Sequence, residues 1–122
     1  MSDRIKIFDS ELNIMNCIWD NEPVKAVDIA KFAGEKFGWK KNTTYTVIKK
    51  LVDKNIAKRE EPYFVVSSLV SRDQIQKEET AELIEKLYGG NTKKFITSFL
   101  SRENLSKNDI DKIKEIIDSY DD

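Results

Sequence analysis

The hydrophobic pattern of this chain changes its period at Asn55, and this change restricts the fold more than any other feature. The preceding residues, 40 to 55, read KKNTTYTVIKKLVDKN and place one apolar stripe along a helix. Its inward face is formed by Thr44, Val47, Ile48, Leu51 and Val52. Residues 56–59 and 63–67 then have the composition of two short strands around a turn at Glu60-Glu61-Pro62. A helix followed at once by a tight β-hairpin is therefore predicted.

Two more helices are predicted before this pair of elements. The first starts at Asp9 or Ser10, either of which can cap its N-terminus, and runs to about Asp20. The second ends at Phe37, where Gly38 suits the left-handed residue just past a helix end. Three helices followed by a β-hairpin make a winged helix-turn-helix, so the predicted fold class is mainly α with a β-hairpin wing.

The chain from residue 72 onward is predicted to be helical again, in three pieces. Helices are expected at residues 73–88 and 92–100, and a third begins at Ser106, which can cap it. About 50 residues cannot bury enough apolar surface alone, so a second copy is expected to cover this region in a two-fold dimer. The residues expected at the dimer interface are Leu83, Leu87, Phe95, Phe99, Ile110, Ile113 and Ile117. The predicted domains are a DNA-binding domain at 1–71 and a helical dimerisation domain at 72–122.

Charge is distributed unevenly along the chain, although the whole carries a net charge of only −1. Residues 36 to 59 hold eight basic residues against one acidic residue, a net charge of +7. The chain from Asp73 onward holds 8 basic and 12 acidic residues. This asymmetry indicates two parts with different tasks, the first of which suits a polyanion.

The basic helix at residues 40–55 carries the mixture of side chains that DNA recognition requires. Short hydrogen-bonding side chains reach base edges in the major groove, and cations contact phosphates. The predicted DNA-binding residues are Lys40, Lys41, Asn42, Thr43, Thr46, Lys49 and Lys50 on the helix, with Lys58 and Arg59 on the wing. The alternative is a winged-helix protein-interaction module that binds no DNA, whose lysines are simply solvated.

Composition argues against an enzyme, a metal site or a bound cofactor. The chain has no histidine, which removes the commonest general base and zinc ligand, and only 4 glycines, none in a phosphate-binding pattern. Its one cysteine, Cys17, lies between apolar neighbours and is expected to be a core residue. No segment has the roughly 18 apolar residues of a membrane span, so a cytoplasmic protein with no membrane insertion is expected.

Several segments together resemble the penicillinase-repressor family (BlaI/MecI). They are SELNIMNCIW, the tryptophan before the threonine-rich helix, TTYTVIKKLVDKNI, YGG and FITSFLSRENLSKNDIDKIKEII. The resemblance implies a bacterial winged-helix repressor that binds a dyad operator as a homodimer and regulates β-lactamase or other antibiotic-resistance genes. It places the base contacts at Asn42, Thr43, Thr46 and Lys50. It also implies inactivation by a protease linked to a membrane β-lactam sensor, with cleavage between Ser98 and Phe99.

The chain departs from the family pattern at positions that bear on function. The usual Ser-Pro at the start of the recognition helix is Lys40-Lys41 here, and the usual lysine before the first threonine is Asn42. The residue before Phe99, usually asparagine, is Ser98. The cysteine cluster of the copper-responsive branch is absent from the sequence, which excludes copper sensing through such a cluster. A changed operator preference is expected from the first two departures.

Overall fold

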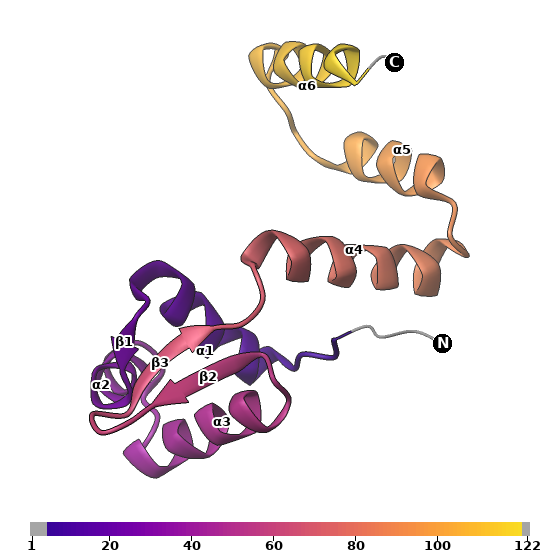
Figure 1. Cartoon of the computed structure of the whole chain (residues 1–122). Helices are drawn as coiled ribbons and strands as arrows, with labels where there is room; N and C mark the ends of the chain where they lie inside the picture. Colours follow the sequence, from indigo (N-terminus) through magenta and orange to yellow (C-terminus); the bar gives the residue numbers. More distant parts are fainter. Residues whose placement is uncertain (1–4, 121–122) are drawn as a thin grey trace. The chain divides into compact units, whose positions relative to one another are not determined.

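The computed structural model describes residues 5–120 and confirms the predicted fold class, mainly α with a small antiparallel sheet (Figure 1). The chain forms two compact units that divide between Glu79 and Thr80, inside the fourth helix. The elements are α1 (Asp9–Asn21), β1 (Val24–Lys25), α2 (Ala26–Phe37), α3 (Lys41–Asp53), β2 (Ala57–Glu60), β3 (Val65–Ser68), α4 (Arg72–Tyr88), α5 (Thr92–Arg102) and α6 (Lys107–Ser119).

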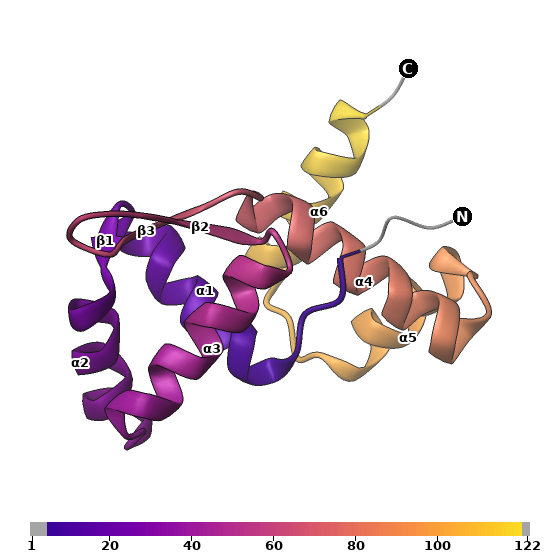
Figure 2. The ribbon, with the colours of Figure 1, turned by 60° about the horizontal axis from the view of Figure 1, so that its bottom comes forward.

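The first unit has a closed hydrophobic core, in which α1, α2 and α3 pack against one another and against the sheet (Figure 2). Each of these elements contributes fully buried side chains, and the start of α4 adds one more. Burying one such aliphatic side chain stabilises a fold by about 1.5–3 kcal/mol. The largest of them are Ile14, Met15, Ile18, Ile29, Ile48, Leu51, Ile56, Val66 and Ile75.

The sheet has three strands in the order β1-β3-β2, so the predicted hairpin gains a third strand. Val24 pairs with Val66, and Lys25 pairs with Val65. The sequence did not reveal β1, because two residues are too few to show a strand period. A hydrogen bond of 2.9 Å from the backbone N–H of Ala26 to the carbonyl of Phe64 continues the pairing into the first residue of α2.

Two residues with left-handed backbone end the helices of the helix-turn-helix, as the sequence predicts. Gly38 ends α2 with φ 72°, and its N–H donates to carbonyls of the last helical turn. Asn55 follows α3 with φ 62°, a conformation that asparagine tolerates better than most residues. The chain can therefore turn directly from α3 into β2.

The predicted cap of α1 is wrong. The residue that precedes the helix is Phe8, and both Asp9 and Ser10 lie inside the first turn. The carboxylate of Glu11, in that same turn, accepts a hydrogen bond of 3.0 Å from the backbone N–H of Phe8. Because Glu11 reaches back to the helix start in this way, no serine or aspartate is needed there.

The second unit consists of the end of α4 with α5 and α6, and it has little interior of its own. Ile84 is the one buried apolar side chain among its described residues, at 8% exposure. The helix starts are nevertheless well formed. Asn91 caps α5 by accepting from the N–H of Lys94, and Ser106 caps α6 as predicted by accepting from the N–H of Asp109. The helices are therefore locally stabilised while most of their apolar side chains remain uncovered.

No helix within residues 5–120 is both long enough and apolar enough to cross a bilayer.

Candidate nucleic-acid interface and dimer surface

Helix α3 has one buried and one exposed face, as its sequence predicts. Thr44, Val47, Ile48 and Leu51 are buried against the core of the first unit. The opposite face is formed by exposed residues, namely Asn42, Thr43, Thr46, Lys49 and Lys50. All five predicted helix contacts that follow Lys40 and Lys41 are therefore exposed to solvent.

The polar groups on this outer face are held by short-range contacts. The Thr46 hydroxyl donates a hydrogen bond of 2.9 Å to the carbonyl of Asn42, one turn earlier. Lys49 forms an exposed ion pair of 3.0 Å with Asp53. Such a pair contributes at most about 1 kcal/mol in water, so a phosphate can readily replace the aspartate.

The start of α3 is an electropositive point. No side chain caps it, and its first turn contains no acidic residue. The unpaired N–H groups of a helix start attract anions, and Lys40 and Lys41 add two exposed cations there. Lys40 and Lys41 therefore add positive charge to a helix start that no side chain caps.

The two predicted wing residues lie on opposite faces of the sheet. Arg59 is paired with Val66, whose side chain is fully buried, so Arg59 projects toward the side of the core and α3. Lys58, its neighbour along the strand, projects from the other face. The guanidinium of Arg59 lies 4.1 Å from the centre of the Phe64 ring and forms an ion pair with Glu61. Arg59 is thus on the α3 side of the wing, and Lys58 is not.

Two further exposed lysines were not predicted as contacts, one on the same face of the sheet as Lys58 and one on α2. Lys25 lies in β1, with its ammonium 5.6 Å from the centre of the exposed Tyr63 ring. Lys31 of α2 lines a shallow hollow of about 270 Å³ together with Lys41 and the exposed Val27. Pairing of β1 with β3 and packing of α2 beside α3 bring these lysines into place, and neither contact has a sequence signal.

One lysine of residues 36–59, the basic window of the sequence, has a structural role instead. The ammonium of Lys54 lies 2.7 Å from the carboxylate of Glu11, which is only 2% exposed, and 4.4 Å from the centre of the Phe8 ring. It also donates to the carbonyl of Lys6 at 3.3 Å. Its charge is therefore largely neutralised inside the first unit.

Cys17 is a core residue, as predicted. Its side chain is 3% exposed. Burial raises the pKa of the thiol, the charge of Asp20 raises it further, and a hydrogen bond from the Asn21 side chain lowers it in part. A protonated, buried thiol is a poor nucleophile. Within residues 5–120 no three His, Cys, Asp or Glu side chains lie close enough together to hold a metal ion.

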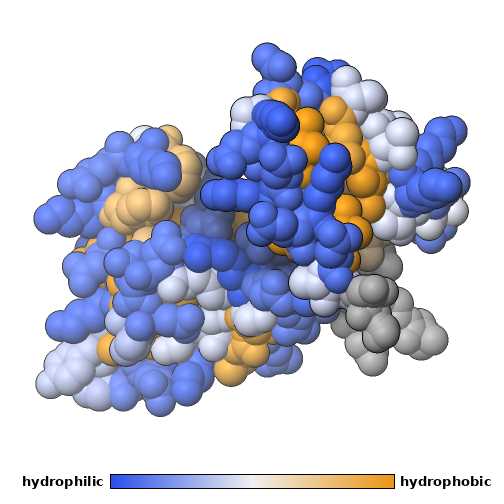
Figure 3. Space-filling view, turned by 90° about the horizontal axis from the view of Figure 1, so that it is seen from above, coloured by the Kyte–Doolittle hydropathy of each residue, from blue (hydrophilic) through white to orange (hydrophobic). Residues whose placement is uncertain are grey.

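The predicted interface residues of the second unit are mostly exposed in the single chain. Leu83, Leu87, Phe99, Ile110 and Ile117 are between 40% and 61% exposed, and Phe95 and Ile113 are half-buried. Strongly hydrophobic residues lie side by side on the surface of α5 and α6 (Figure 3). Large apolar patches of this kind mark interaction sites on soluble proteins.

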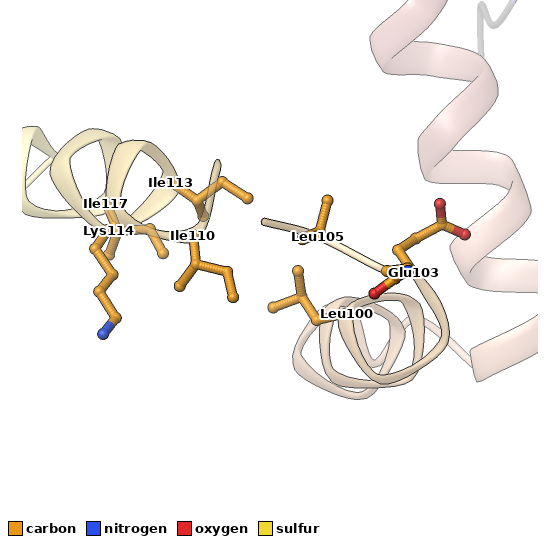
Figure 4. Close-up of a pocket in the computed structure, with 8 residues that line it drawn as sticks. Leu100, Glu103, Leu105, Ile110, Ile113, Lys114 and Ile117 are labelled. Carbon is orange, nitrogen blue, oxygen red and sulfur yellow. The ribbon is translucent and has the colours of Figure 1, made fainter. Parts of the chain in front are cut away.

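A hollow of about 280 Å³ lies between α5 and α6 within this surface. Leu100 of α5 and Ile110 of α6 extend into it from opposite sides, and Leu105 of the connection also lines it (Figure 4). The predicted cleavage bond, Ser98 to Phe99, lies in the middle of α5, with Ser98 half-buried and Phe99 50% exposed. The hollow is open and apolar, so it is suited to side chains rather than to a polar ligand.

Comparison with known proteins decides the family. The model of the penicillinase repressor family matches residues 7–119. This chain belongs to that family. A penicillinase repressor of Staphylococcus aureus is 28% identical over 116 residues, covering 93% of this chain and 92% of the relative. The methicillin resistance regulatory protein MecI of Mammaliicoccus sciuri is 26% identical over 114 residues, covering 92% of this chain and 93% of the relative.

Solved structures of a penicillinase repressor share the fold of the first unit. The solution structure of the DNA-binding domain of the repressor BlaI matches 61% of this chain and 93% of its own, with a TM-score of 0.54 and 21% identity. The monomeric form of BlaI from Bacillus licheniformis, solved in complex with the blaP half-operator, matches the same share with a TM-score of 0.52 and 22% identity. The winged helix predicted from the sequence is therefore confirmed.

Membership of the penicillinase repressor family confirms two further predictions. The protein is a repressor with a DNA-binding winged helix, in a family that regulates antibiotic resistance, and it is not an enzyme. The roles of individual residues, the assembly of two copies and the cleavage of the chain stay predictions at this point.

Proposed function

We propose that this repressor binds a dyad operator as a homodimer, with α3 of each copy in the major groove. The observation that carries the proposal is the outer face of α3, where Asn42, Thr43, Thr46 and Lys50 are all exposed. Amide and hydroxyl groups can read base edges, and a lysine can reach guanine or phosphate. The complex of BlaI with a half-operator supports the view that one winged-helix unit can hold half a site.

Phosphate contacts come from the cations around this face. Lys40 and Lys41 flank the uncapped start of α3, and Arg59 lies on the same side of the wing. We assign Lys58 to phosphates further along the backbone, because its strand position points it away from α3. These contacts position the protein and add affinity without reading sequence.

The homodimer forms through α4, α5 and α6 in this proposal. Among the described residues of the second unit, nine large apolar side chains are at least 39% exposed, which is costly for a monomer in water. A two-fold partner presents the same surface and covers it. Two half-sites held by one dimer bind far more tightly than two separate half-sites, because the second contact becomes intramolecular.

The regulated genes in this proposal are those for β-lactamase or other antibiotic resistance, and the protein acts in the cytoplasm. Relief of repression follows from cleavage between Ser98 and Phe99 by a protease linked to a membrane β-lactam sensor. The position of this bond supports the idea physically, since a cut in the middle of α5 separates Phe99 and α6 from Phe95 and α4. The halves then lack a shared apolar surface.

Selection from a pool of random duplexes tests operator binding. The wild type is expected to enrich an inverted repeat whose half-site centres are about 10 base pairs, or a multiple, apart. A variant with Thr46→Ala and Lys50→Ala is the matched control, because both residues are exposed and the α3 core is untouched. Enrichment of no common motif by the wild type would favour the protein-interaction module instead.

Mass spectrometry of the chain in its host tests the cleavage. After exposure to a β-lactam, a fragment that ends at Ser98 is expected, and a Phe99→Pro variant should not produce it. An intact chain in derepressed cells would show that another signal releases the operator.

A further inference from the structure

A continuous series of side chains joins the first turn of α3 to the wing. The ammonium of Lys41 lies 5.7 Å from the centre of the Tyr45 ring. Tyr45 stacks on Phe64, with ring centres 5.9 Å apart and an interplanar angle of 20°. The guanidinium carbon of Arg59 lies 4.1 Å from the centre of the Phe64 ring. Cations are attracted to aromatic faces, so the two rings, here called the aromatic bridge, hold one cation at each end.

Phe64 is fixed from more than one direction. Its backbone is left-handed, with φ 53°, a conformation that residues with a bulky side chain adopt only when their surroundings impose it. Its carbonyl accepts the hydrogen bond from the first residue of α2, Ala26. Its ring contacts α3 through Tyr45 and β2 through Arg59. One residue of the wing therefore touches both helices of the helix-turn-helix.

We propose that Tyr45 and Phe64 are positioning residues for DNA binding, which fix the distance between the start of α3 and the wing. Lys41 and Arg59 then reach phosphates of the same half-site together, without either ring contacting DNA. Glu61 holds Arg59 through an ion pair in the free protein and gives it up to a phosphate. This inference rests on the proposed operator binding and adds two residues to it.

A double-mutant cycle tests the proposal. Arg59→Gln is compared in the wild type and in a Phe64→Leu background, with operator affinity measured at several salt concentrations. In the wild type, Arg59→Gln should reduce the slope of log affinity against log salt by about 0.9 for each phosphate that the protein no longer neutralises. In the Phe64→Leu background the same change should have little effect, because Arg59 is no longer held in place. Equal effects in both backgrounds would overturn the proposal.

Two control variants separate positioning from general damage. Phe64→Tyr keeps the ring and should retain the wild-type slope. Tyr63→Leu removes a neighbouring wing ring that is 71% exposed and contacts Lys25 instead of α3. The effect of Arg59→Gln should be undiminished in that background, and a smaller effect there would contradict a specific role for Phe64.

A measurement without DNA distinguishes a failure of the proposed operator binding from a failure of the positioning role. The side-chain N–H resonance of Arg59 in an NMR spectrum should be shifted by the Phe64 ring in the wild type and in Phe64→Tyr, but not in Phe64→Leu. Circular dichroism should show that all variants are folded. If the shift is present and the wild type binds no operator, the proposed function fails and the positioning role falls with it. If the operator binds and the cycle is additive, only the positioning role fails.

Discussion

The two units of this repressor differ in how completely a single chain buries them. In the first, side chains from α1, α2, α3, the sheet and the start of α4 close around one core, and residues such as Ile14 and Ile48 are fully buried. In the second, α5 and α6 have no buried residue. The core of the first unit is therefore closed by the chain's own residues, whereas most apolar side chains of the second unit stay exposed in the single chain.

Charge follows the same division. The first unit carries its excess cations on the surface of α3 and the wing, where Lys41 and Lys50 are exposed. The second unit combines a slight excess of acidic residues with an apolar surface, which suits another protein surface rather than DNA. The surface of the first unit thus suits a polyanion, and that of the second suits the second copy that we propose.

Phe99→Asp should have the largest effect, because it places a charge in the apolar surface that we propose a second copy covers. We expect monomers in sedimentation velocity experiments and an operator affinity that is lower by about 10²-fold or more. Ser101→Asp is the matched control, since Ser101 is exposed on the same helix and lies outside the predicted interface. An unchanged dimer in Phe99→Asp would show that α5 is not at the interface.

Lys54→Met tests how much the ion pair between Lys54 and Glu11 stabilises the first unit. The change leaves the buried carboxylate of Glu11 without its cation, which should lower the free energy of unfolding by about 3 kcal/mol in urea denaturation. Adding Glu11→Gln should recover much of this stability.

The same Lys54→Met variant should bind the operator with a wild-type salt slope, whereas Lys50→Met should reduce the slope by about 0.9 if Lys50 neutralises one phosphate. A stable Lys54→Met variant with weakened DNA binding would place Lys54 on the DNA surface instead.

Thr46→Ala should change which sequences bind rather than how tightly all of them do. A hydroxyl that donates to Asn42 can still accept a hydrogen bond from a base, and its removal should cost about 1–3 kcal/mol at one base step. Lys58→Ala should weaken binding to all sequences about equally, as expected for a phosphate contact. Binding measured across a set of single-base operator variants distinguishes these patterns, and the reverse pattern would exchange the roles of helix and wing.

Thr44→Val should have the smallest effect and the opposite sign. Thr44 is fully buried on the inward face of α3, and its hydroxyl has no hydrogen-bond partner within residues 5–120. Valine has nearly the same shape without the hydroxyl, so thermal unfolding should show a gain of about 1 kcal/mol. A marked decrease in stability would contradict an unpaired hydroxyl at this position.

The sequence predicted the elements whose pattern is local. The stripe of α3, the left-handed Gly38 and Asn55, and the Ser106 cap all follow from residue type and spacing, and the structure has them. Strand β1 was not predicted, because its two residues form a strand only through their pairing with β3. The Asp9 or Ser10 cap was wrong because Glu11 reaches back to the helix start.

The candidate site was predicted in outline and refined by contacts between distant segments. Sequence composition grouped Lys58 with Arg59 and counted Lys54 among the basic window. Strand alternation places Lys58 and Arg59 on opposite faces of the sheet, and Lys54 forms an ion pair with Glu11. The aromatic bridge could not be predicted, because Tyr45 and Phe64 come from different elements and meet only in the folded chain.

The most direct test of a dyad-binding homodimer is the stoichiometry of binding, measured by analytical ultracentrifugation with labelled duplexes that contain either the selected dyad or one half-site. Two chains are expected on the dyad, with an affinity for the half-site that is lower by about 10²-fold or more. One chain per duplex, with equal affinity for dyad and half-site, would contradict the homodimer.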